Sequence, residues 1–416
     1  MDLKDRRVMR IEEALKVFYR SINLTKLSIE TLPLKDALGR VLASDVAAPI
    51  DIPQFNLSAV DGYAVLANDT FGASPANPVI FKVKELRDGV DLSLKSGEAA
   101  YVSTGSPIPN GSDAVVMLEY AKKIGEGVIE VYKPVSPGED VSWKGEDVKK
   151  GEIVLKEGMR LKPQDLGMLA SMGFTSVNVY RRPIVGIIST GSELVPPGSE
   201  RTFGRVIDVN SIILSAMTMD YGGEPLPMGI VEDDLEKLRS MIRIGLVKSD
   251  ILVLTGGTSV GKADLTKEAI DSLGTPGMVV HGVAMRPGRP TALASIEGKP
   301  VMNLSGYPVA AMIGFYVFGK DLISSMLRTV DEPEPHVFAK VTRRIPSPPG
   351  IRSYVRVNVS RRGLDLIAEP VRSTGSGIIS SMVRANGLLV IPEDVEGVDE
   401  GEMVEVILMR PIQALS

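Results

Sequence analysis

The sequence contains no cysteine and only two histidines, His281 and His336, among its 416 residues. Without cysteine there are no disulfides, no thiolate metal sites and no cysteine nucleophile. Two histidines are too few for a multi-histidine zinc site, and they argue against a Ser–His–Asp triad. Any catalytic metal must therefore bind mainly oxygen ligands, which favours Mg²⁺. Carboxylates, lysines and backbone amides remain for the chemistry.

The chain also lacks a basic surplus and a long apolar run. The net charge is −5 and the pI is about 5.4, which argues against a general nucleic-acid binder. The best membrane candidate, PVAAMIGFYVFG at 308–319, is shorter than a bilayer requires. The N-terminal stretch MDLKDRRVMRIEEALKVF lacks the apolar core of a signal peptide. We expect a cytoplasmic protein without nucleic-acid or membrane partners.

The pattern of apolar and turn-forming residues changes along the chain. Residues 4–22 have the apolar spacing of a helix. From 30 to 180, short apolar runs alternate with clusters of Gly, Pro, Asn and Asp, which predicts β structure with turns. From Arg182 onward, strand patterns alternate with helix patterns, which predicts a doubly wound, mostly parallel α/β sheet. After DEPEP, at 331–335, strand patterns return.

These changes predict a multidomain α/β plus β fold. At roughly 100–200 residues per domain, a chain of this length holds two to four domains. The expected parts are a β-rich N-terminal half, a central doubly wound α/β domain and a small C-terminal domain resembling a β-barrel. The predicted bounds are 1–45 with 138–181 for a mixed α/β domain, 46–137 for an inserted β-rich domain, 182–329 for the α/β domain and 330–416 for the C-terminal β domain.

The stretch LTGGTSVGKADLTK, at 254–267, is close to a phosphate-binding P-loop. Gly256, Gly261 and Lys262 have the P-loop spacing between a strand and a helix. Ala263 stands where a Ser or Thr hydroxyl would bind Mg²⁺, and Asp264 follows. Lys262 could neutralise phosphate and Asp264 could hold the metal. A tight turn with Asp264 as the helix N-cap explains the loop equally well.

Two further glycine loops, ISTGSEL at 188–194 and NLSGYPV at 303–309, also join a strand to a helix. In doubly wound sheets, ligands bind beyond the carboxyl ends of the strands. The three loops therefore predict one site. Glu193 could share a metal there with Asp264, or serve only as a partner of a helix dipole. The predicted loop residues are Ser189, Thr190, Gly191, Gly256, Gly257, Ser259, Gly261, Ser305, Gly306 and Pro308.

Three other segments carry candidate groups. Asp61 and Gly62 in NLSAVDGYAV form a pair that is typical of a hairpin turn, which is the favoured interpretation of Asp61 alone. The pair Thr104–Gly105 could offer a hydroxyl and amides to an anion, although a plain loop between strands is favoured. Arg286 and Arg289 flank Pro-Gly in MRPGRP; two guanidiniums in a rigid turn suit phosphate or an oxyanion, and a solvated charged turn is the commoner use.

Taken together and in this order, the stretches SAVDGYAV, STGSPIPNGSDAVV, STGSELV, GIVEDD, LTGGTSVGKADLTK, MRPGRP and LSGYPVAA resemble the molybdopterin molybdenumtransferases. These are molybdenum-cofactor insertases related to the E domain of gephyrin, and the resemblance covers essentially the full length. It implies a molybdopterin-binding type of α/β domain. It also implies cleavage of adenylylated molybdopterin, release of AMP and insertion of molybdate or tungstate. A divalent cation, usually Mg²⁺, is implied as well.

The resemblance also implies an elongated homodimer, in which the α/β site of one subunit faces the DGY segment of the other. The catalytic residues it implies are Asp61, Glu193 and Asp264. The implied metal ligands are Glu193, Asp233, Asp234 and Asp264. Thr104, Gly105 and the three glycine loops would bind substrate. The cations that would hold phosphate or molybdate are Lys262, Lys267, Arg286 and Arg289.

The chain departs from the family pattern at three places. Ser305-Gly306-Tyr307-Pro308 replaces Pro-Gly-Asn-Pro, Ser192 replaces an aspartate, and VSWK has only Lys144 where arginines are frequent. These changes could alter ligand preference, including tungstate over molybdate. Two alternatives stay open: a molybdopterin adenylyltransferase, which typically has a single domain, and a non-catalytic molybdopterin-binding scaffold or carrier. Ala263 disfavours a third, a phosphate-binding NTPase.

Overall fold

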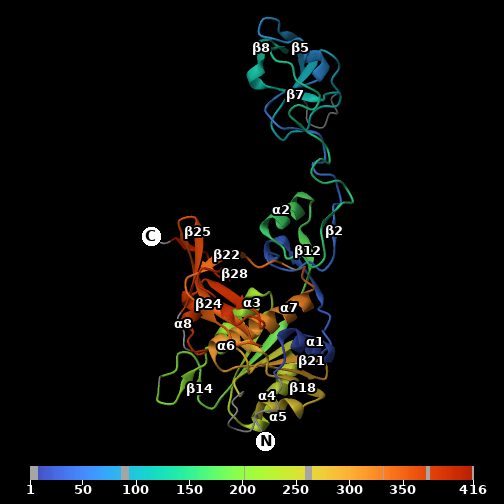
Figure 1. Cartoon of the computed structure of the whole chain (residues 1–416). Coiled ribbons are helices and arrows are strands. Elements are labelled where there is room, and N and C mark those ends of the chain that lie inside the picture. Colours follow the sequence, from blue (N-terminus) through green and yellow to red (C-terminus); the bar gives the residue numbers. More distant parts are fainter. Residues whose placement is uncertain are drawn as a thin grey trace. The chain divides into compact units, whose positions relative to one another are not determined.

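In the computed structural model the chain forms two compact units (Figure 1). Unit 1 comprises Met1–Glu30, Gly39–Val41 and Val179–Ser416, and unit 2 comprises Thr31–Leu38 and Leu42–Asn178. The N-terminal helix therefore belongs to the same unit as the second half of the chain. The residues that the structure describes are 8–85, 93–200, 202–257, 265–330, 332–371 and 375–414.

Unit 2 consists mainly of β structure, which confirms the predicted β-rich N-terminal half. Its largest sheet has six strands in the order β7-β4-β6-β5-β9-β8. Tyr63, Phe81 and Ile129 are buried in the core beside this sheet. The strands are β4 (Gly62–Val65), β5 (Val79–Lys84), β6 (Glu98–Val102), β7 (Ala114–Met117), β8 (Ala121–Gly125) and β9 (Val128–Val131).

Asp61 and Gly62 do not form the hairpin turn expected from the pair alone. Asp61 lies in a bend, and Gly62 is the first residue of β4, which pairs with both β6 and β7. A Cβ at Gly62 would overlap the carbonyl oxygen of Val116, so the sheet admits only glycine here. The Asp61 carboxylate is therefore attached at the end of a central strand rather than at a loop tip.

Unit 2 also contains short strand pairs and one α-helix. β2 (Val46–Ala47) pairs with β11 (Ile153–Leu155), and β3 (Leu57–Ser58) pairs with β10 (Val141–Ser142). Helix α2 (Pro163–Ser171) starts with proline, whose missing N–H costs nothing in the first turn.

The central part of unit 1 is a six-stranded sheet in the order β16-β13-β17-β21-β20-β18. β16, β13, β17 and β21 are parallel neighbours, whereas β20 runs antiparallel to β21 and β18. The predicted mostly parallel sheet is confirmed. The strands are β13 (Ile184–Thr190), β16 (Glu224–Val231), β17 (Ile251–Thr255), β18 (Pro276–His281), β20 (Ala292–Ile296) and β21 (Lys299–Leu304).

Helices cover both faces of this sheet, as a doubly wound fold requires. On one face, Ile188 of β13 and Leu254 of β17 share a buried core with residues of α4 and α5. On the other face, a Cβ at Gly314 of α6 would lie 3.0 Å from Leu304 of β21, and the rings of Tyr221 and Phe315 stack between α3 and α6. These helices are α3 (Asn210–Asp220), α4 (Leu235–Lys248), α5 (Leu265–Asp271) and α6 (Pro308–Gly314).

The helix that closes the α/β domain is longer than the apolar run 308–319. α6 continues through a π-helical stretch, Phe315–Gly319, into α7 (Lys320–Leu327). The combined helix Pro308–Leu327 has 20 residues and a mean hydropathy of 1.3, so by length and composition it could cross a membrane. The prediction that this segment is too short to span a bilayer is therefore wrong for the helix as a whole. Its buried share is 61%, and Phe315 and Phe318 are fully buried, as in a core helix.

Three other parts of the fold differ from expectation. The helix predicted over 4–22 is α1 (Ile11–Ser21) within the described residues. The predicted strand MVVHGVAM divides into β18 and the short β19 (Met285–Arg286). β20, which the sequence pattern did not predict, pairs between β18 and β21 and supplies the antiparallel step in the sheet.

The C-terminal domain is a small closed barrel, as predicted. β24 pairs with both β25 and β26, which closes the order β24-β25-β22-β28-β26 on itself. Val357, Val359, Leu389 and Val406 are buried inside. The strands are β22 (His336–Val341), β24 (Arg352–Arg362), β25 (Asp365–Pro370), β26 (Gly387–Ile391) and β28 (Met403–Leu408).

The barrel is joined to the α/β domain by strand pairing. β19 runs parallel to the start of β24, with Met285 opposite Arg352 and Arg286 opposite Ser353. Arg352 also forms ion pairs with Glu12 of α1 at 2.7 Å and with Glu393 at 2.8 Å. One arginine therefore links α1 to the barrel beside the shared strand pair.

Candidate functional site

The three predicted glycine loops meet at the carboxyl edge of the α/β sheet. β13, β17 and β21 are parallel neighbours, so their ends at Thr190, Thr255 and Leu304 lie at the same edge. A Cβ at Gly256 would overlap the carbonyl oxygen of Thr190, and one at Gly306 would lie 3.5 Å from Cα of Gly256. The loops are thus in direct backbone contact, as the topology predicted.

Backbone hydrogen bonds hold this junction together. The Gly256 N–H donates to the Leu304 carbonyl at 3.1 Å, and the Thr190 hydroxyl donates to the Thr255 carbonyl at 3.2 Å. Gly256 has a φ of +101° and Gly257 a φ of +66°, both in the region that glycine favours. The Gly256 N–H is thus used within the fold, while Gly257, the next residue, is exposed at the surface of the loop. Ser189, at the end of β13, is fully buried and its Oγ has no partner among the described residues.

Glu193 lies directly beyond β13, on an exposed loop. A Cβ at Gly191 would be 2.7 Å from Glu193 Oε1, so the carboxylate is folded over that glycine. The Gly191 N–H donates to the Val231 carbonyl at 3.0 Å. The loop of Glu193 is therefore tied to the end of the neighbouring strand β16.

The acidic residues after β16 border the same loop. The Asp233 N–H donates to Ser192 Oγ at 3.1 Å. Asp234 is the N-cap of α4, and its Oδ1 accepts the Lys237 N–H at 2.9 Å. The Asp234 carboxylate therefore caps α4, which is a common role for an aspartate at the start of a helix. The Asp233 side chain is exposed beside the Glu193 loop.

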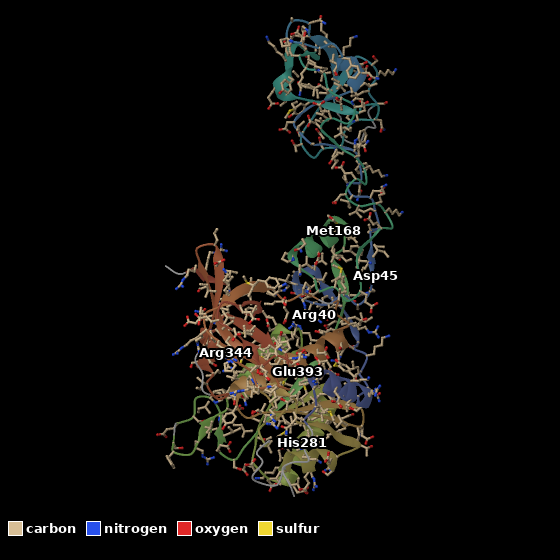
Figure 2. All side chains as sticks on the ribbon, in the orientation of Figure 1. Arg40, Asp45, Met168, His281, Arg344 and Glu393 are labelled. Carbon is tan, nitrogen blue, oxygen red and sulfur yellow. The ribbon has the colours of Figure 1, made fainter. Side chains whose placement is uncertain are left out.

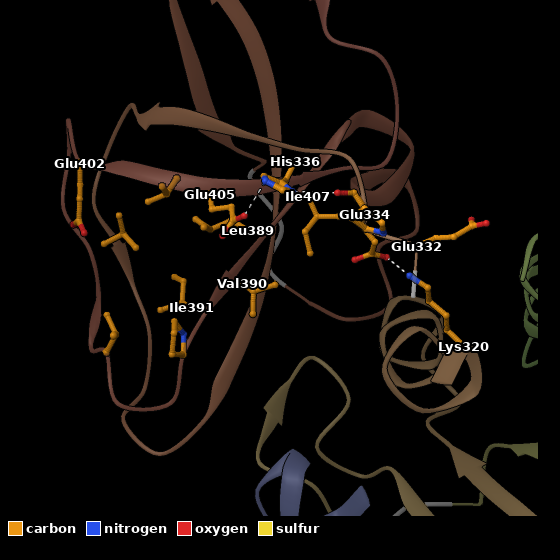
Figure 3. A pocket seen from close by; sticks show the side chains of 15 residues that line it. Lys320, Glu332, Glu334, His336, Leu389, Val390, Ile391, Glu402, Glu405 and Ile407 are labelled. Carbon is orange, nitrogen blue, oxygen red and sulfur yellow. Dashed lines mark hydrogen bonds and ion pairs between the residues drawn. The ribbon is translucent and has the colours of Figure 1, made fainter. Parts of the chain in front are cut away.

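The described acidic residues do not by themselves form a magnesium site. No group of three Asp, Glu or His side chains that could hold a metal occurs in the part of the chain that the structure describes. The two histidines lie in different sheets, since His281 ends β18 and His336 begins β22 (Figures 2 and 3). Four predicted residues lie outside the described residues, namely Ser259, Gly261, Lys262 and Asp264.

The predicted cations have different surroundings. Lys267 forms an ion pair with Asp271 one turn along α5. Arg286, in β19, and Arg289, after the Pro-Gly turn, are both exposed. Burial lowers the pKa of Arg356 on β24, and the nearby charge of Arg286 lowers it further. Two guanidiniums are thus held close enough to repel each other, an arrangement that a bound anion would relieve.

Arg356 is the residue that the sequence did not reveal. It lies in SYVRVNVS, which has only the pattern of a strand. The pairing of β19 with β24 brings it near Arg286, more than sixty positions earlier in the chain. Only a prediction of that pairing could have found it.

In unit 2, Asp61, Thr104 and Gly105 lie together. Asp61 Oδ1 accepts the Thr104 N–H at 2.7 Å and the Thr104 hydroxyl at 3.0 Å. These two bonds, the backbone one first, lower the pKa of Asp61. The Gly105 N–H donates to the Ser58 carbonyl at 2.7 Å. The exposed carboxylate is therefore fixed in direction and ionised at neutral pH.

A cavity of about 570 Å³ lies elsewhere, beside β26 and β28 of the barrel and next to Lys320 of α7 (Figure 3). Its walls include apolar residues of β26 and β28. Lys320 and Glu334, which form an ion pair, line it as well, as do His336 and Glu405, whose Nε2 and Oε1 lie 3.4 Å apart. None of the described residues predicted to bind substrate lines it. The cavity is thus separate from the carboxyl edge of the sheet.

Three family descriptions match consecutive parts of the chain. Residues 9–173 match the MoeA N-terminal region (domain I and II), and residues 339–409 match the MoeA C-terminal region (domain IV). Residues 186–325, which contain the three glycine loops, match the "Probable molybdopterin binding domain".

Individual proteins match over nearly the whole length. A protein of Methanocaldococcus jannaschii whose name places it in molybdopterin biosynthesis is 41% identical over 390 residues, which cover 92% of each chain. The molybdopterin molybdenumtransferase of Bacillus subtilis is 34% identical, over 92% of this chain and 90% of its own. The crystal structure of the molybdopterin biosynthesis moeA protein from Pyrococcus horikoshii OT3 is 37% identical, has a TM-score of 0.83, and covers 97% of this chain and 100% of that chain. The chain belongs to the MoeA family, the molybdopterin molybdenumtransferases.

Proposed function

We propose that this protein inserts molybdate or tungstate into adenylylated molybdopterin and releases AMP. The observation that carries the proposal is the meeting of three glycine loops at one sheet edge, where Gly256 contacts both Thr190 and Gly306. Such an edge is the usual ligand site of a doubly wound sheet. The name of the Bacillus subtilis relative supports the same reaction class.

In the proposed reaction, one P–O bond of the phosphoanhydride breaks and AMP leaves. An oxygen atom, from water or from the oxyanion, forms the new P–O bond. The N–H groups of Gly191 and Gly256 already donate within the fold, so the exposed Gly257 and Gly306 are the loop residues whose backbone N–H groups would hold phosphate oxygens. The metal oxyanion is a substrate: bonds from the metal to the two dithiolene sulfurs form as metal–oxygen bonds break, the released oxygen leaves as water with the thiol protons, and the metal keeps its oxidation state.

Charged side chains would set the positions of the reactants. Arg286, Arg289 and Arg356 would hold the oxyanion or a phosphate, which lowers the repulsion between Arg286 and Arg356. Asp61, ionised and fixed by Thr104, would orient a reacting oxygen. In the proposed homodimer this residue comes from the other subunit.

A divalent cation, Mg²⁺ by the oxygen chemistry of the candidate ligands, belongs to the proposal. Glu193, Asp233 and Asp264 are the residues proposed to hold it, while Asp234 caps α4. When bound, the cation would polarise phosphate oxygens. The four-domain division and a cytoplasmic location are also part of the proposal.

The test is AMP release from adenylylated molybdopterin with Mg²⁺, in the presence of molybdate, of tungstate or of neither. Oxyanion-dependent release by the wild type, lost in Glu193→Gln, would support an insertase and identify its preferred metal. Tight substrate binding without release would instead favour the scaffold or carrier. Synthesis of adenylylated molybdopterin from ATP would favour the adenylyltransferase.

A further inference from the structure

The loop from Ser305 to Pro308 is held in place at several atoms. The Gly306 carbonyl accepts a hydrogen bond from Asn210 Nδ2, in the first turn of α3, at 3.0 Å. The Tyr307 N–H donates to Ser305 Oγ at 3.2 Å, and Pro308 begins α6. The backbone on both sides of Tyr307 is therefore fixed by the fold.

One edge of the Tyr307 ring packs against the chain. A Cβ at Gly377 would lie 3.2 Å from Tyr307 Cδ1 and 3.6 Å from Cε1, so the ring edge lies against the backbone of that glycine. The Val309 N–H donates to the Ser376 carbonyl at 3.0 Å, which holds the two segments together. The residue is nevertheless 63% exposed. Most of the ring is thus open, while its position is determined.

This ring is attached where two of the ligand loops touch. Gly306, its neighbour in the chain, is the residue that packs against Cα of Gly256. A large aromatic side chain on a fixed loop, left open at the ligand edge of the sheet, offers a flat surface to whatever binds there. Phosphate and molybdate have no flat face, so such a surface suits a heterocycle.

We propose that Tyr307 is a stacking platform for a heterocycle of the substrate. The inference rests on the proposed function, whose substrate contains two heterocycles with a flat aromatic ring, adenine and the pyrimidine ring of the pterin. Tyrosine replaces the asparagine usual in the family pattern, so the platform would be a specificity-determining feature of this chain. Stacking on the ring needs its flat face and not its hydroxyl, and that difference makes the proposal testable.

The test is calorimetric binding of AMP, pterin-6-carboxylate and inorganic pyrophosphate to the full chain. Tyr307→Leu should weaken binding of the stacked heterocycle roughly tenfold, and Tyr307→Phe should change it less than about twofold. Pyrophosphate affinity should not change. Phe338→Leu is the matched control, because Phe338 is 62% exposed, lies on β22 and belongs to no predicted site.

The probes identify the heterocycle, because only one of AMP and pterin-6-carboxylate should respond to Tyr307→Leu. Unchanged binding of both, with a lower melting temperature in Tyr307→Leu, would reduce Tyr307 to a packing residue and overturn the proposal. Binding of neither heterocycle by the wild type would overturn it too. If the protein releases AMP but neither heterocycle binds more weakly to Tyr307→Leu, the proposed function holds and the stacking proposal fails. If Tyr307→Leu weakens binding but the wild type releases no AMP, the stacking proposal holds and the proposed function fails.

Discussion

The DGY segment of unit 2 and the carboxyl edge of the α/β sheet in unit 1 position their carboxylates differently. Asp61 accepts two hydrogen bonds from Thr104, which fix its direction and lower its pKa. Glu193 is exposed over Gly191, and no hydrogen bond from the described residues reaches its carboxylate. In unit 2, hydrogen bonds within the protein already orient the Asp61 carboxylate. In unit 1, they hold the backbone of the glycine loops, and we expect a ligand or ion to orient the Glu193 carboxylate.

The largest expected effect comes from removing either carboxylate. Asp61→Asn and Glu193→Gln should each lower AMP release by roughly 100-fold or more, since each removes a charge proposed to act on the reacting groups. Initial rates of AMP release measure this. A rate within a fewfold of wild type for Asp61→Asn would show that the preset carboxylate has no part in the reaction.

Mixing the two inactive variants sharpens the comparison further. If the two carboxylates act in one site shared between subunits, random mixing gives half mixed dimers, each with one intact site, and about one quarter of the wild-type rate. Co-expression with two affinity tags isolates the mixed species. No recovery in the purified mixed dimer would count against a shared site.

Gly256→Ala tests how closely the backbone packs at the sheet edge. The new Cβ would overlap the Thr190 carbonyl oxygen at a φ of +101°. We expect about 2–4 kcal/mol less stability, measured by denaturant unfolding. Gly229→Ala is the matched control, because Gly229 has a φ of +95° and open space around its Cα. It should lose about 1–2 kcal/mol. Equal losses would mean that only the φ angle matters.

Arg356→Met separates oxyanion binding from the carboxylates. The change removes one of two mutually repelling guanidiniums, so the melting temperature should stay the same or rise. The molybdate concentration for half-maximal AMP release should increase about 10- to 100-fold, the effect of losing a charged hydrogen bond. Differential scanning fluorimetry and molybdate titrations give the two values. A fall in stability with unchanged molybdate dependence would make Arg356 a structural residue.

Thr104→Val should give the smallest effect. It removes the side-chain hydrogen bond to Asp61 and keeps the backbone one, which is the larger cause of the lowered pKa. The rate at neutral pH should fall about two- to tenfold. Because the folded pKa lies below its usual value, wild-type activity that needs this carboxylate is kept until the pH falls through that lowered pKa. In the variant, the acid limb of the rate–pH profile should move to higher pH. If it does not move, the group that titrates there is not Asp61.

Much of the fold could be predicted from local patterns. Buried parallel strands such as Ile184–Thr190 and Ile251–Thr255 are nearly continuous apolar runs followed by glycine-bearing loops. Their strand character and their alternation with helices along the chain could therefore be predicted. β20 could not, because three of the five residues of Ala292–Ile296 are Ala or Ser, and the strand is set by pairing with its neighbours β18 and β21. The Asp61–Gly62 pair was misjudged for a similar reason: pairing with two strands decides its conformation.

The site was predictable where the chain returns regularly to one sheet edge. Thr190, Gly256 and Gly306 meet because parallel strands end together, which topology alone implies. The partnership of Arg286 with Arg356 was not predictable, since it depends on a two-residue strand pairing between domains. The capping role of Asp234 was hidden as well, because metal ligands and helix caps use the same carboxylate.

The parallel pair of β19 and β24 restricts how this gene can be divided. One strand of the barrel sheet is encoded before the closing helix Pro308–Leu327 and the others after it. A fragment ending at the linker would expose β19 as an edge with unpaired amides, a surface that promotes aggregation. The excised barrel would likewise lose a strand next to β24. The second half of the chain, together with α1, should therefore be expressed and truncated as one piece.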